Sequence, residues 1–252
     1  MTAQGVRRRV SAWLAFVVTD ICGVIAWVYL FLLNRTDVTR PYGDVGHQNV
    51  MFIVNHQSPL DSFLVTLAAF FPRALVAPRL HPWSLAAEEY WFRNRRRAWL
   101  ARHLRCIPVK RNGHDAEALE TLRRELPRGM TVYFPEGRRS PDGRIRRGLP
   151  GAGYLAHATK ATVVPVAIDG LLDAMPYSNP RPRIGRRIRI AFGDPISCDD
   201  LFLRTRTLTT SQAIVDRAMS AVTELHYHLR APDAAPVSLP RAWEVRDENV
   251  AR

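Results

Sequence analysis

His56 and Asp61 are the residues of this sequence whose types and spacing point most directly to acid–base chemistry. Residues 51–54 read MFIV, and a short apolar run that ends in β-branched side chains predicts a buried strand. Ser58 and Pro59 then predict a helix start, since serine can cap a helix and proline suits its first position. His56 would lie on the turn between the two elements. Asp61 could accept a hydrogen bond from one imidazole nitrogen and leave the other as an outward-facing base.

The same spacing also has a purely structural explanation. Asp61 can serve only as a capping residue and His56 only as a turn residue, and a short motif does not separate the two. The pair His228 and Asp233 repeats the spacing, and we assign it no function. The choice therefore depends on what the rest of the chain supplies.

Two other predicted strand ends carry polar residues. Residues 106–110 (CIPVK) predict a strand that is followed by Arg111, and residues 131–134 (TVYF) predict one that is followed by Glu136. In open α/β folds, binding sites gather at strand ends. Taken singly, Arg111 can be a solvated strand end and Glu136 a capping or ion-paired carboxylate. Together, a base, an orienting acid, a phosphate-binding arginine and a glycine turn suit the acylation of an alcohol on a phosphorylated lipid.

The elements around these residues alternate between strands and helices, which predicts an α/β fold. Residues 34–49 are polar and predict a connection into the sheet. Pro165 interrupts an apolar run, which favours an edge strand or a bulge at that point. Further strands are predicted at 74–77, 163–168 and 186–192, and helices at 62–71, 85–90, 98–104, 115–126, 154–159 and 209–229.

The most hydrophobic segment is residues 10–33, which follow three arginines at positions 7–9. It is too long for a signal peptide and lacks a small-residue cleavage site. One spanning helix needs about 20 apolar residues, but Asp20 near its middle would cost about 3 kcal/mol. We therefore favour two short helices, 10–18 and 21–33, that dip into one leaflet and keep the flanking arginines on the cytoplasmic face. A buried core helix is the remaining alternative.

Composition limits the classes of partner that the chain is expected to bind. The 36 basic and 23 acidic residues give a net charge of +13, which favours nucleic acid, acidic lipid surfaces or phosphorylated substrates. No recognised nucleic-acid-binding motif supports the first, whereas the arginine cluster at positions 93 and 95–97 fits an anionic membrane surface. The three cysteines are far apart and predict neither a disulfide framework nor a zinc site. A reducing compartment is expected.

Four short segments occur in an order that a known family shares: 55–61 (NHQSPLD), 107–111 (IPVKR), 134–140 (FPEGRRS) and 164–168 (VPVAI). Together they resemble the four motifs of the glycerophospholipid acyltransferases, of the type that makes phosphatidic acid in bacteria (1-acyl-sn-glycerol-3-phosphate acyltransferases). The resemblance implies a mixed sheet flanked by helices in an acyltransferase domain over residues 41–230, preceded by membrane-attaching helices over 1–40. The proline-containing, charged residues 231–252 predict a disordered tail.

The resemblance also implies a mechanism. His56 takes the proton from a lysophospholipid hydroxyl as that hydroxyl attacks the thioester of acyl-CoA or acyl-carrier protein, and Asp61 orients the imidazole. Backbone N–H groups near Ser58 are candidates to stabilise the oxyanion. No metal or cofactor is implied, and the expected location is the cytoplasmic face of the cell membrane, in contact with membrane lipids. The implied substrate-binding residues are Arg111, Glu136, Gly137, Arg138 and Pro165.

The sequence departs from the family pattern at three basic residues. Arg138 stands where threonine is usual, Lys110 where an acidic residue is usual, and Arg105 lies near a frequent glycine. The added positive charge leaves the acceptor open between 1-acylglycerol-3-phosphate and another lipid, such as a lyso-ornithine lipid or a glycolipid. A non-catalytic membrane protein that binds acyl-CoA and lipid is the alternative from another class.

Overall fold

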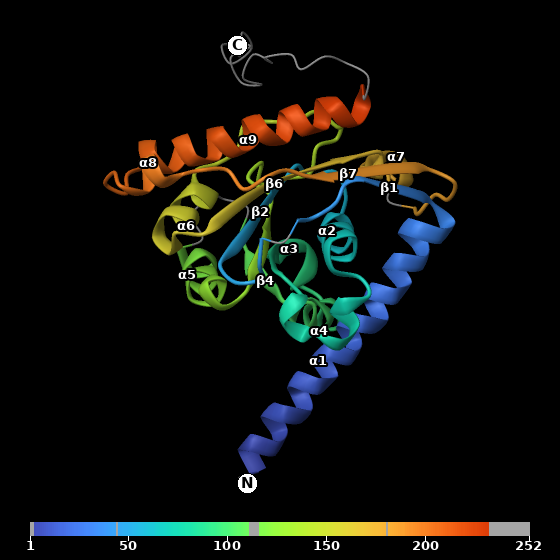
Figure 1. The fold of residues 1–252 in the computed structure, drawn as a ribbon. Coiled ribbons are helices and arrows are strands. Elements are labelled where there is room, and N and C mark those ends of the chain that lie inside the picture. Colours follow the sequence, from blue (N-terminus) through green and yellow to red (C-terminus); the bar gives the residue numbers. More distant parts are fainter. Residues whose placement is uncertain (1–2, 44, 111–115, 180, 232–252) are drawn as a thin grey trace.

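The computed structural model describes residues 3–43, 45–110, 116–179 and 181–231. Its centre is a seven-stranded sheet with the order β1-β7-β6-β2-β5-β3-β4 (Figure 1). The β6–β7 pair is antiparallel and the other neighbouring pairs are parallel, so the predicted mixed sheet is confirmed. The strands are β1 (Arg35–Arg40), β2 (Val50–Val54), β3 (Trp83–Ala87), β4 (Cys106–Val109), β5 (Met130–Tyr133), β6 (Thr162–Asp169) and β7 (Arg187–Phe192).

Helices cover both faces of this sheet (Figure 1). One face packs against α5, α6 and α9, and the opposite face packs against α1, α2 and α7. The helices are α1 (Ala3–Trp27), α2 (Asp61–Phe70), α3 (Glu88–Trp91), α4 (Arg95–His103), α5 (Ala116–Glu125), α6 (Gly151–Thr159), α7 (Leu171–Ala174), α8 (Asp199–Phe202) and α9 (Leu208–Arg230). Short π and 3-10 turns are η1 (Val28–Leu33), η2 (Arg73–Val76), η3 (Pro78–Leu80) and η4 (Leu126–Arg128).

The central strand β2 is buried at every position. Successive side chains of a strand point to opposite faces, so Met51 and Ile53 join the apolar cluster under α9 while Phe52 and Val54 join the one under α2. Pairing with β5 and β6 fixes β2 on both sides. The buried strand predicted at 51–54 is confirmed, and its carboxyl end lies in the middle of the sheet.

Two neighbouring elements were predicted with the wrong type. The expected strand at 74–77 is the 3-10 turn η2, which is enclosed between Pro72 and Pro78. The expected helix at 85–90 is β3 followed by the single turn α3. Alanine and glutamate in this segment favour a helix, but pairing of β3 with both β4 and β5 outweighs that preference. Tertiary pairing decided what local propensity could not.

One further prediction about the sheet was wrong, and of the two alternatives for Pro165 the edge strand is excluded. Residues 34–49 are not only a connection, because β1 forms there and pairs in parallel with β7 at the sheet edge. Pro165 does not lie on an edge strand, because β6 runs between β2 and β7. The β6–β7 ladder stops at the pair Val166–Phe192, and beyond it the N–H of Gly193 donates to the carbonyl of Pro165. The proline therefore sits where the ladder is interrupted.

The N-terminus is one helix rather than the predicted pair. α1 runs into the π-helical turn η1 without a break at Asp20. Oγ1 of Thr19 donates to the carbonyl of His103 at 2.8 Å, and Oδ1 of Asp20 lies 3.5 Å from Nε2 of His81. These polar side chains contact the sheet domain, which explains why they do not end the helix.

The outer side of this helix is apolar. Among the described residues, one helical segment, Phe16–Leu33, is long and apolar enough to cross a membrane. Only 11% of this segment is buried. Ile21 and Ile25 are 56% and 64% exposed.

The predicted domain boundaries at 40/41 and 230/231 stay predictions, and the predicted tail lies outside the described residues apart from Ala231.

Candidate active site

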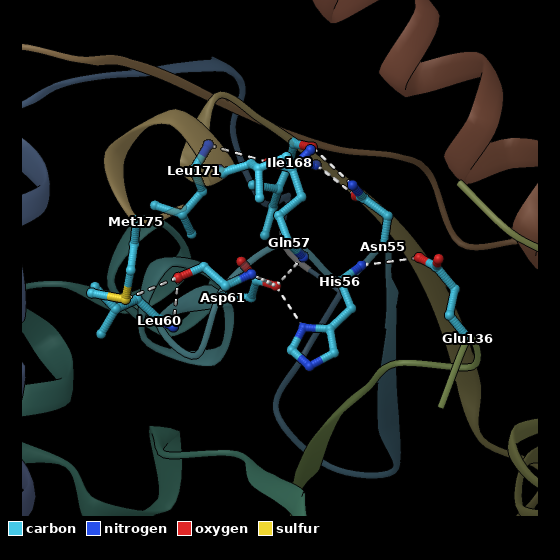
Figure 2. Close-up of polar contacts among 11 residues, drawn as sticks. Asn55, His56, Gln57, Leu60, Asp61, Glu136, Ile168, Leu171 and Met175 are labelled. Atoms are coloured by element: carbon cyan, nitrogen blue, oxygen red, sulfur yellow. Dashed lines mark hydrogen bonds and ion pairs between the residues drawn. The ribbon is translucent and has the colours of Figure 1, made fainter. Parts of the chain in front are cut away.

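His56 and Asp61 lie together at the carboxyl end of β2. His56 is the second residue after the strand, and Asp61 is the first residue of α2. Nδ1 of His56 lies 2.7 Å from Oδ2 of Asp61, which is hydrogen-bonding distance (Figure 2). The structure thus brings together the two residues that the sequence singled out.

The carboxylate of Asp61 is fully buried and held by its own turn. Oδ2 also accepts the backbone N–H groups of Gln57 at 2.7 Å and Ser58 at 2.9 Å. The helix cap is Leu60 rather than the predicted Ser58, whose Oγ instead accepts the N–H of Leu60. Because the N–H groups around Ser58 have these partners, the expectation that they stabilise an oxyanion is not supported.

The imidazole of His56 is oriented on two sides. Its ring stacks on Phe134 with the centroids 4.1 Å apart and the planes 16° apart. Asp61 fixes Nδ1, and Figure 2 shows the other ring nitrogen pointing away from that contact. Nε2 has no hydrogen bond to any residue that the structure describes, and the side chain is 20% exposed. The open nitrogen is therefore available to a proton donor from outside the chain.

Glu136 supports the backbone of the histidine. Oε1 accepts the N–H of His56 at 3.0 Å and Oε2 accepts the N–H of Arg146 at 3.2 Å. The residue is only 7% exposed. This burial raises the pKa of Glu136 to about 7, although the two N–H groups act in the opposite direction. Both oxygens thus bind backbone, a role that the sequence did not suggest.

Asn55 and Gln57, on either side of the histidine, were not predicted as site residues. The side-chain amide of Asn55 donates to the carbonyl of Ile168 at 2.9 Å and accepts its N–H at 2.8 Å. Oε1 of Gln57 accepts the N–H of Leu171 at 3.2 Å. Two buried amides thereby continue the β2–β6 connection past the end of the strand (Figure 2). The available signal was a pair of amide residues directly after a buried apolar run.

The third motif forms a tight turn beside the histidine. Gly137 has φ of +68°, which favours glycine, and its N–H donates to the carbonyl of Phe134 at 3.1 Å. The N–H of Ser140 donates to the carbonyl of His56 at 2.7 Å. These contacts fasten the turn to the backbone on which the base is carried.

Arg139 in this turn was missed in favour of its neighbour Arg138, which is exposed. The guanidinium of Arg139 lies 4.9 Å from the ring centroid of Tyr177. Its Nη1 is buried and has no hydrogen-bond partner among the described residues. A buried guanidinium nitrogen without a partner is costly, so Arg139 is a better-placed anion ligand than Arg138. Sequence alone cannot tell which of two adjacent arginines faces inward.

Two predicted site residues are not joined to this cluster. Arg111 lies outside the described residues, directly after Lys110 at the end of β4. Pro165 is buried within β6 in register with Ile53, and its ring faces Gly193 and Leu225 of α9. The roles expected for both stay predictions. Among the described residues, no group of three or more His, Cys, Asp or Glu side chains is arranged to hold a metal ion.

This arrangement can move a proton but offers no nucleophile of its own. A histidine oriented by a buried carboxylate can take a proton from a hydroxyl group. In the part of the chain that the structure describes, no serine or cysteine is hydrogen-bonded to Nε2 of His56. The geometry suits a reaction in which the hydroxyl belongs to a substrate.

Comparison with known proteins agrees with this chemistry. The model of the family described as Acyltransferase matches residues 34–169, more than half of the chain. This chain belongs to the acyltransferase family. The resemblance to the glycerophospholipid acyltransferases is confirmed, and all four motifs lie inside the matched region.

Curated relatives of this chain carry different names. It is 32% identical over 158 residues to N-acylphosphatidylethanolamine synthase of Arabidopsis thaliana, covering 58% of this chain and 55% of the relative. It is 29% identical over 207 residues to Taffazin of Dictyostelium discoideum, covering 77% and 66%. It is 28% identical over 189 residues to 1-acyl-sn-glycerol-3-phosphate acyltransferase of Limnanthes douglasii, covering 71% and 60%. The chain spans between about half and two thirds of the length of these relatives.

A solved structure has the same fold. This chain superposes on the 1-acyl-sn-glycerophosphate acyltransferase PlsC of Thermotoga maritima with a TM-score of 0.63, covering 91% of this chain and 85% of that chain. Sequence identity is 20%, so this likeness concerns the fold. One departure from the family pattern can be seen in the backbone. The family often has a glycine near position 105, and Arg105 adopts φ of +55°, a region that glycine favours.

Proposed function

We propose that this protein transfers a fatty acyl group from acyl-CoA or acyl-carrier protein to the free hydroxyl of a lysophospholipid. The observation that carries the proposal is the His56–Asp61 pair, with one nitrogen bound to a buried carboxylate and the other open. Membership of the acyltransferase family supports the reaction type. No metal or cofactor takes part in the proposed reaction.

His56 acts as the general base. Nε2 takes the proton of the acceptor hydroxyl while the hydroxyl oxygen attacks the thioester carbonyl carbon. The new ester bond forms as the carbon–sulfur bond breaks, and the imidazolium returns the proton to the departing thiolate. Asp61 keeps the proton of the neutral imidazole on Nδ1 and stabilises the imidazolium. A positioned base contributes about 10²–10⁴-fold to the rate.

The acceptor that we propose is 1-acylglycerol-3-phosphate, which would give phosphatidic acid. The motif set and the two Limnanthes relatives support this acceptor. Arg111 is proposed to hold its phosphate, and Nη1 of Arg139, which is buried and has no hydrogen-bond partner among the described residues, adds a second candidate. Gly137 and Arg138 are proposed to line the acceptor side, and Pro165 to support the wall of the fourth motif.

A second acceptor is a candidate because relatives with other names match segments of 158 and 207 residues. N-acylphosphatidylethanolamine synthase and Taffazin are both similar to this chain. The basic residues Lys110 and Arg138 replace the usual family residues. An acceptor with a different head group, such as a lyso-ornithine lipid or a glycolipid, would fit these changes.

The proposed location is the cytoplasmic face of the cell membrane. The exposed apolar side of Phe16–Leu33 supports membrane attachment. Acyl-CoA and acyl-carrier protein are cytosolic donors, so the sheet domain must face the cytosol to meet them. Protease protection of right-side-out and inverted vesicles tests the side, and a sheet domain cleaved only from outside the cell would refute it.

The function is tested by thiol release from acyl-CoA in detergent, with a panel of lysolipid acceptors. We expect release to depend on lysophosphatidic acid and to give phosphatidic acid. Release with only another lysolipid would replace the acceptor but keep the reaction. Binding of acyl-CoA with no release, and none with acylated carrier protein either, would favour the non-catalytic lipid-binding alternative.

A further inference from the structure

A basic hollow lies on the surface at the β7 end of the sheet. Its volume is about 370 Å³, within the range of roughly 300–1,000 Å³ that small-molecule sites have. Its lining comes from the end of β6, from α7, from the loop that leads into β7 and from the start of β7 itself. The charged residues of this lining are Asp169, Asp173, Arg183, Arg186, Arg187 and Arg189. We call this hollow the arginine pocket.

Part of this charge is already paired. Nε of Arg187 lies 2.8 Å from Asp37, and Nη1 of Arg189 lies 3.2 Å from Asp169. Asp169 also lies 3.4 Å from His226 of α9. Burial raises the pKa of Asp169, but these neighbours outweigh burial and hold it below its usual range, so the carboxylate stays ionised.

Two arginines remain without such partners. Within the described residues, neither Arg183 nor Arg186 forms an ion pair. The same holds for Asp173, one of the two carboxylates that line the pocket. Two positive charges against one negative charge leave a net charge of +1 in the unpaired set. This charge complements a phosphate diester, which carries one negative charge, and arginine suits phosphate oxygens.

The backbone that carries these arginines is fastened to the end of the apolar helix. The N–H of Arg186 donates to Oδ1 of Asn34 at 2.8 Å. Oη of Tyr29 donates to the carbonyl of Arg183 at 2.9 Å, and the N–H of Gly185 donates to the carbonyl of Leu33 at 2.8 Å. The arginine pocket is therefore held directly beside the last residues of the candidate membrane segment Phe16–Leu33, where β1, β7 and α7 gather (Figure 1).

Apolar side chains surround the same point. Leu32 is 63% exposed, Leu33 is 49% exposed and Ile184, between the two unpaired arginines, is 66% exposed. Exposed apolar side chains mixed with arginines are typical of a surface that meets the boundary between acyl chains and head groups. Near such a boundary each basic residue contributes about 1 kcal/mol of attraction to an anionic leaflet.

We propose that the arginine pocket binds the phosphate of an anionic membrane phospholipid and so fixes the depth and orientation of the sheet domain at the membrane. The proposal rests on the membrane attachment under Proposed function, and it adds a lipid site separate from His56. Arg183 and Arg186 bind the phosphate oxygens. Ile184, Leu32 and Leu33 contact the acyl region beside it.

The test is binding of the full chain to vesicles of phosphatidylcholine, with and without phosphatidylglycerol, at low and high salt. The variant Arg183→Gln/Arg186→Gln is compared with Arg128→Gln, an exposed arginine of η4 just before β5. We expect the double variant to bind anionic vesicles about thirtyfold more weakly and neutral vesicles equally well. Arg183→Lys/Arg186→Lys should keep most of the anionic preference, which separates charge from misfolding.

The opposite results are distinct from a failure of the proposed enzyme activity, because vesicle binding requires no turnover. An anionic preference equal to that of Arg128→Gln would overturn the lipid site. A raised KM for acyl-CoA with unchanged vesicle binding would also overturn it, because the pocket would then bind a phosphate of the acyl donor. Weak binding of every variant and of the wild type to all vesicles would refute membrane attachment itself.

Discussion

The end of β2 buries polar side chains, whereas α1 exposes apolar ones. At the end of β2, Asn55, Gln57 and Asp61 are at most 2% exposed, and each accepts or donates hydrogen bonds to backbone groups. On α1, Ile21 and Ile25 are more than half exposed. Both regions reverse the usual distribution of polar and apolar residues. The reversal at β2 holds the His56–Asp61 pair that we propose transfers a proton, and the reversal at α1 exposes the apolar surface that we propose meets lipid.

The largest effect that sharpens this contrast is expected for Asp61→Asn. The amide carries no negative charge to stabilise the imidazolium of His56, so we expect kcat to fall about 10²–10⁴-fold with little change in KM. Steady-state thiol release measures this, and thermal unfolding checks the fold. Activity within a few-fold of wild type would mean that Asp61 only caps the turn.

A second contrast compares two asparagines that both bind backbone. Asn55→Ala leaves the buried N–H and carbonyl of Ile168 without a partner, and we expect a loss of about 3 kcal/mol. Asn94→Ala removes only the exposed cap of α4, with an expected loss of about 1 kcal/mol. Urea unfolding gives both values. Equal losses would show that the buried hydrogen bonds of Asn55 stabilise the fold no more than the exposed cap of α4 does.

The third prediction concerns pH. The folded protein keeps the proton of Glu136 up to about pH 7 because burial raises this pKa. The unfolded chain releases the same proton near pH 4.3, which is about the ordinary pKa of glutamate. The unfolded state therefore binds fewer protons in this window, so stability falls by about 4 kcal/mol as the pH rises through it and levels off above.

Glu136→Gln removes this titration. We expect the unfolding free energy of the wild type, relative to that of Glu136→Gln, to fall as the pH rises from about 4.3 to about 7. Above that range the difference should level off. Urea unfolding at a series of pH values measures the difference. A difference that does not change with pH would show that Glu136 is ionised throughout.

The smallest effect is expected on the lipid side. Ile21→Ser/Ile25→Ser removes exposed apolar surface from α1, and we expect roughly tenfold weaker binding to neutral vesicles. Leu203→Ser, which is 89% exposed near α8, is the control and should bind normally. Unchanged binding of the double variant would place the membrane contact elsewhere on the chain.

Local signals in the sequence predicted the centre of the molecule well. The run at 51–54 is apolar at every position, so β2 and the turn that carries His56 could be placed without a structure. The spacing of His56 and Asp61 then gave their contact. The wrong start of α2 did not matter, because Asp61 reaches back to Gln57 and Ser58 from the first helical residue.

What the sequence could not supply depends on partners far along the chain. β3 is a strand because it pairs with β4 and β5, although its residues favour a helix. α1 runs through Asp20, and the neighbouring Thr19 is bonded to the distant carbonyl of His103. Glu136 binds backbone N–H groups that only the folded chain brings to it. Each of these outcomes follows from tertiary contact rather than from local propensity.

The most direct test of the account compares two histidines. His56→Ala and His228→Ala are assayed for acceptor-dependent thiol release, the second as a control because it also precedes an aspartate by the same spacing. We predict that His56→Ala loses about 10²–10⁴-fold in kcat while keeping wild-type stability and acyl-CoA binding, and that His228→Ala keeps full activity. Equal activity of His56→Ala and wild type would contradict the central claim that Nε2 of His56 is the general base.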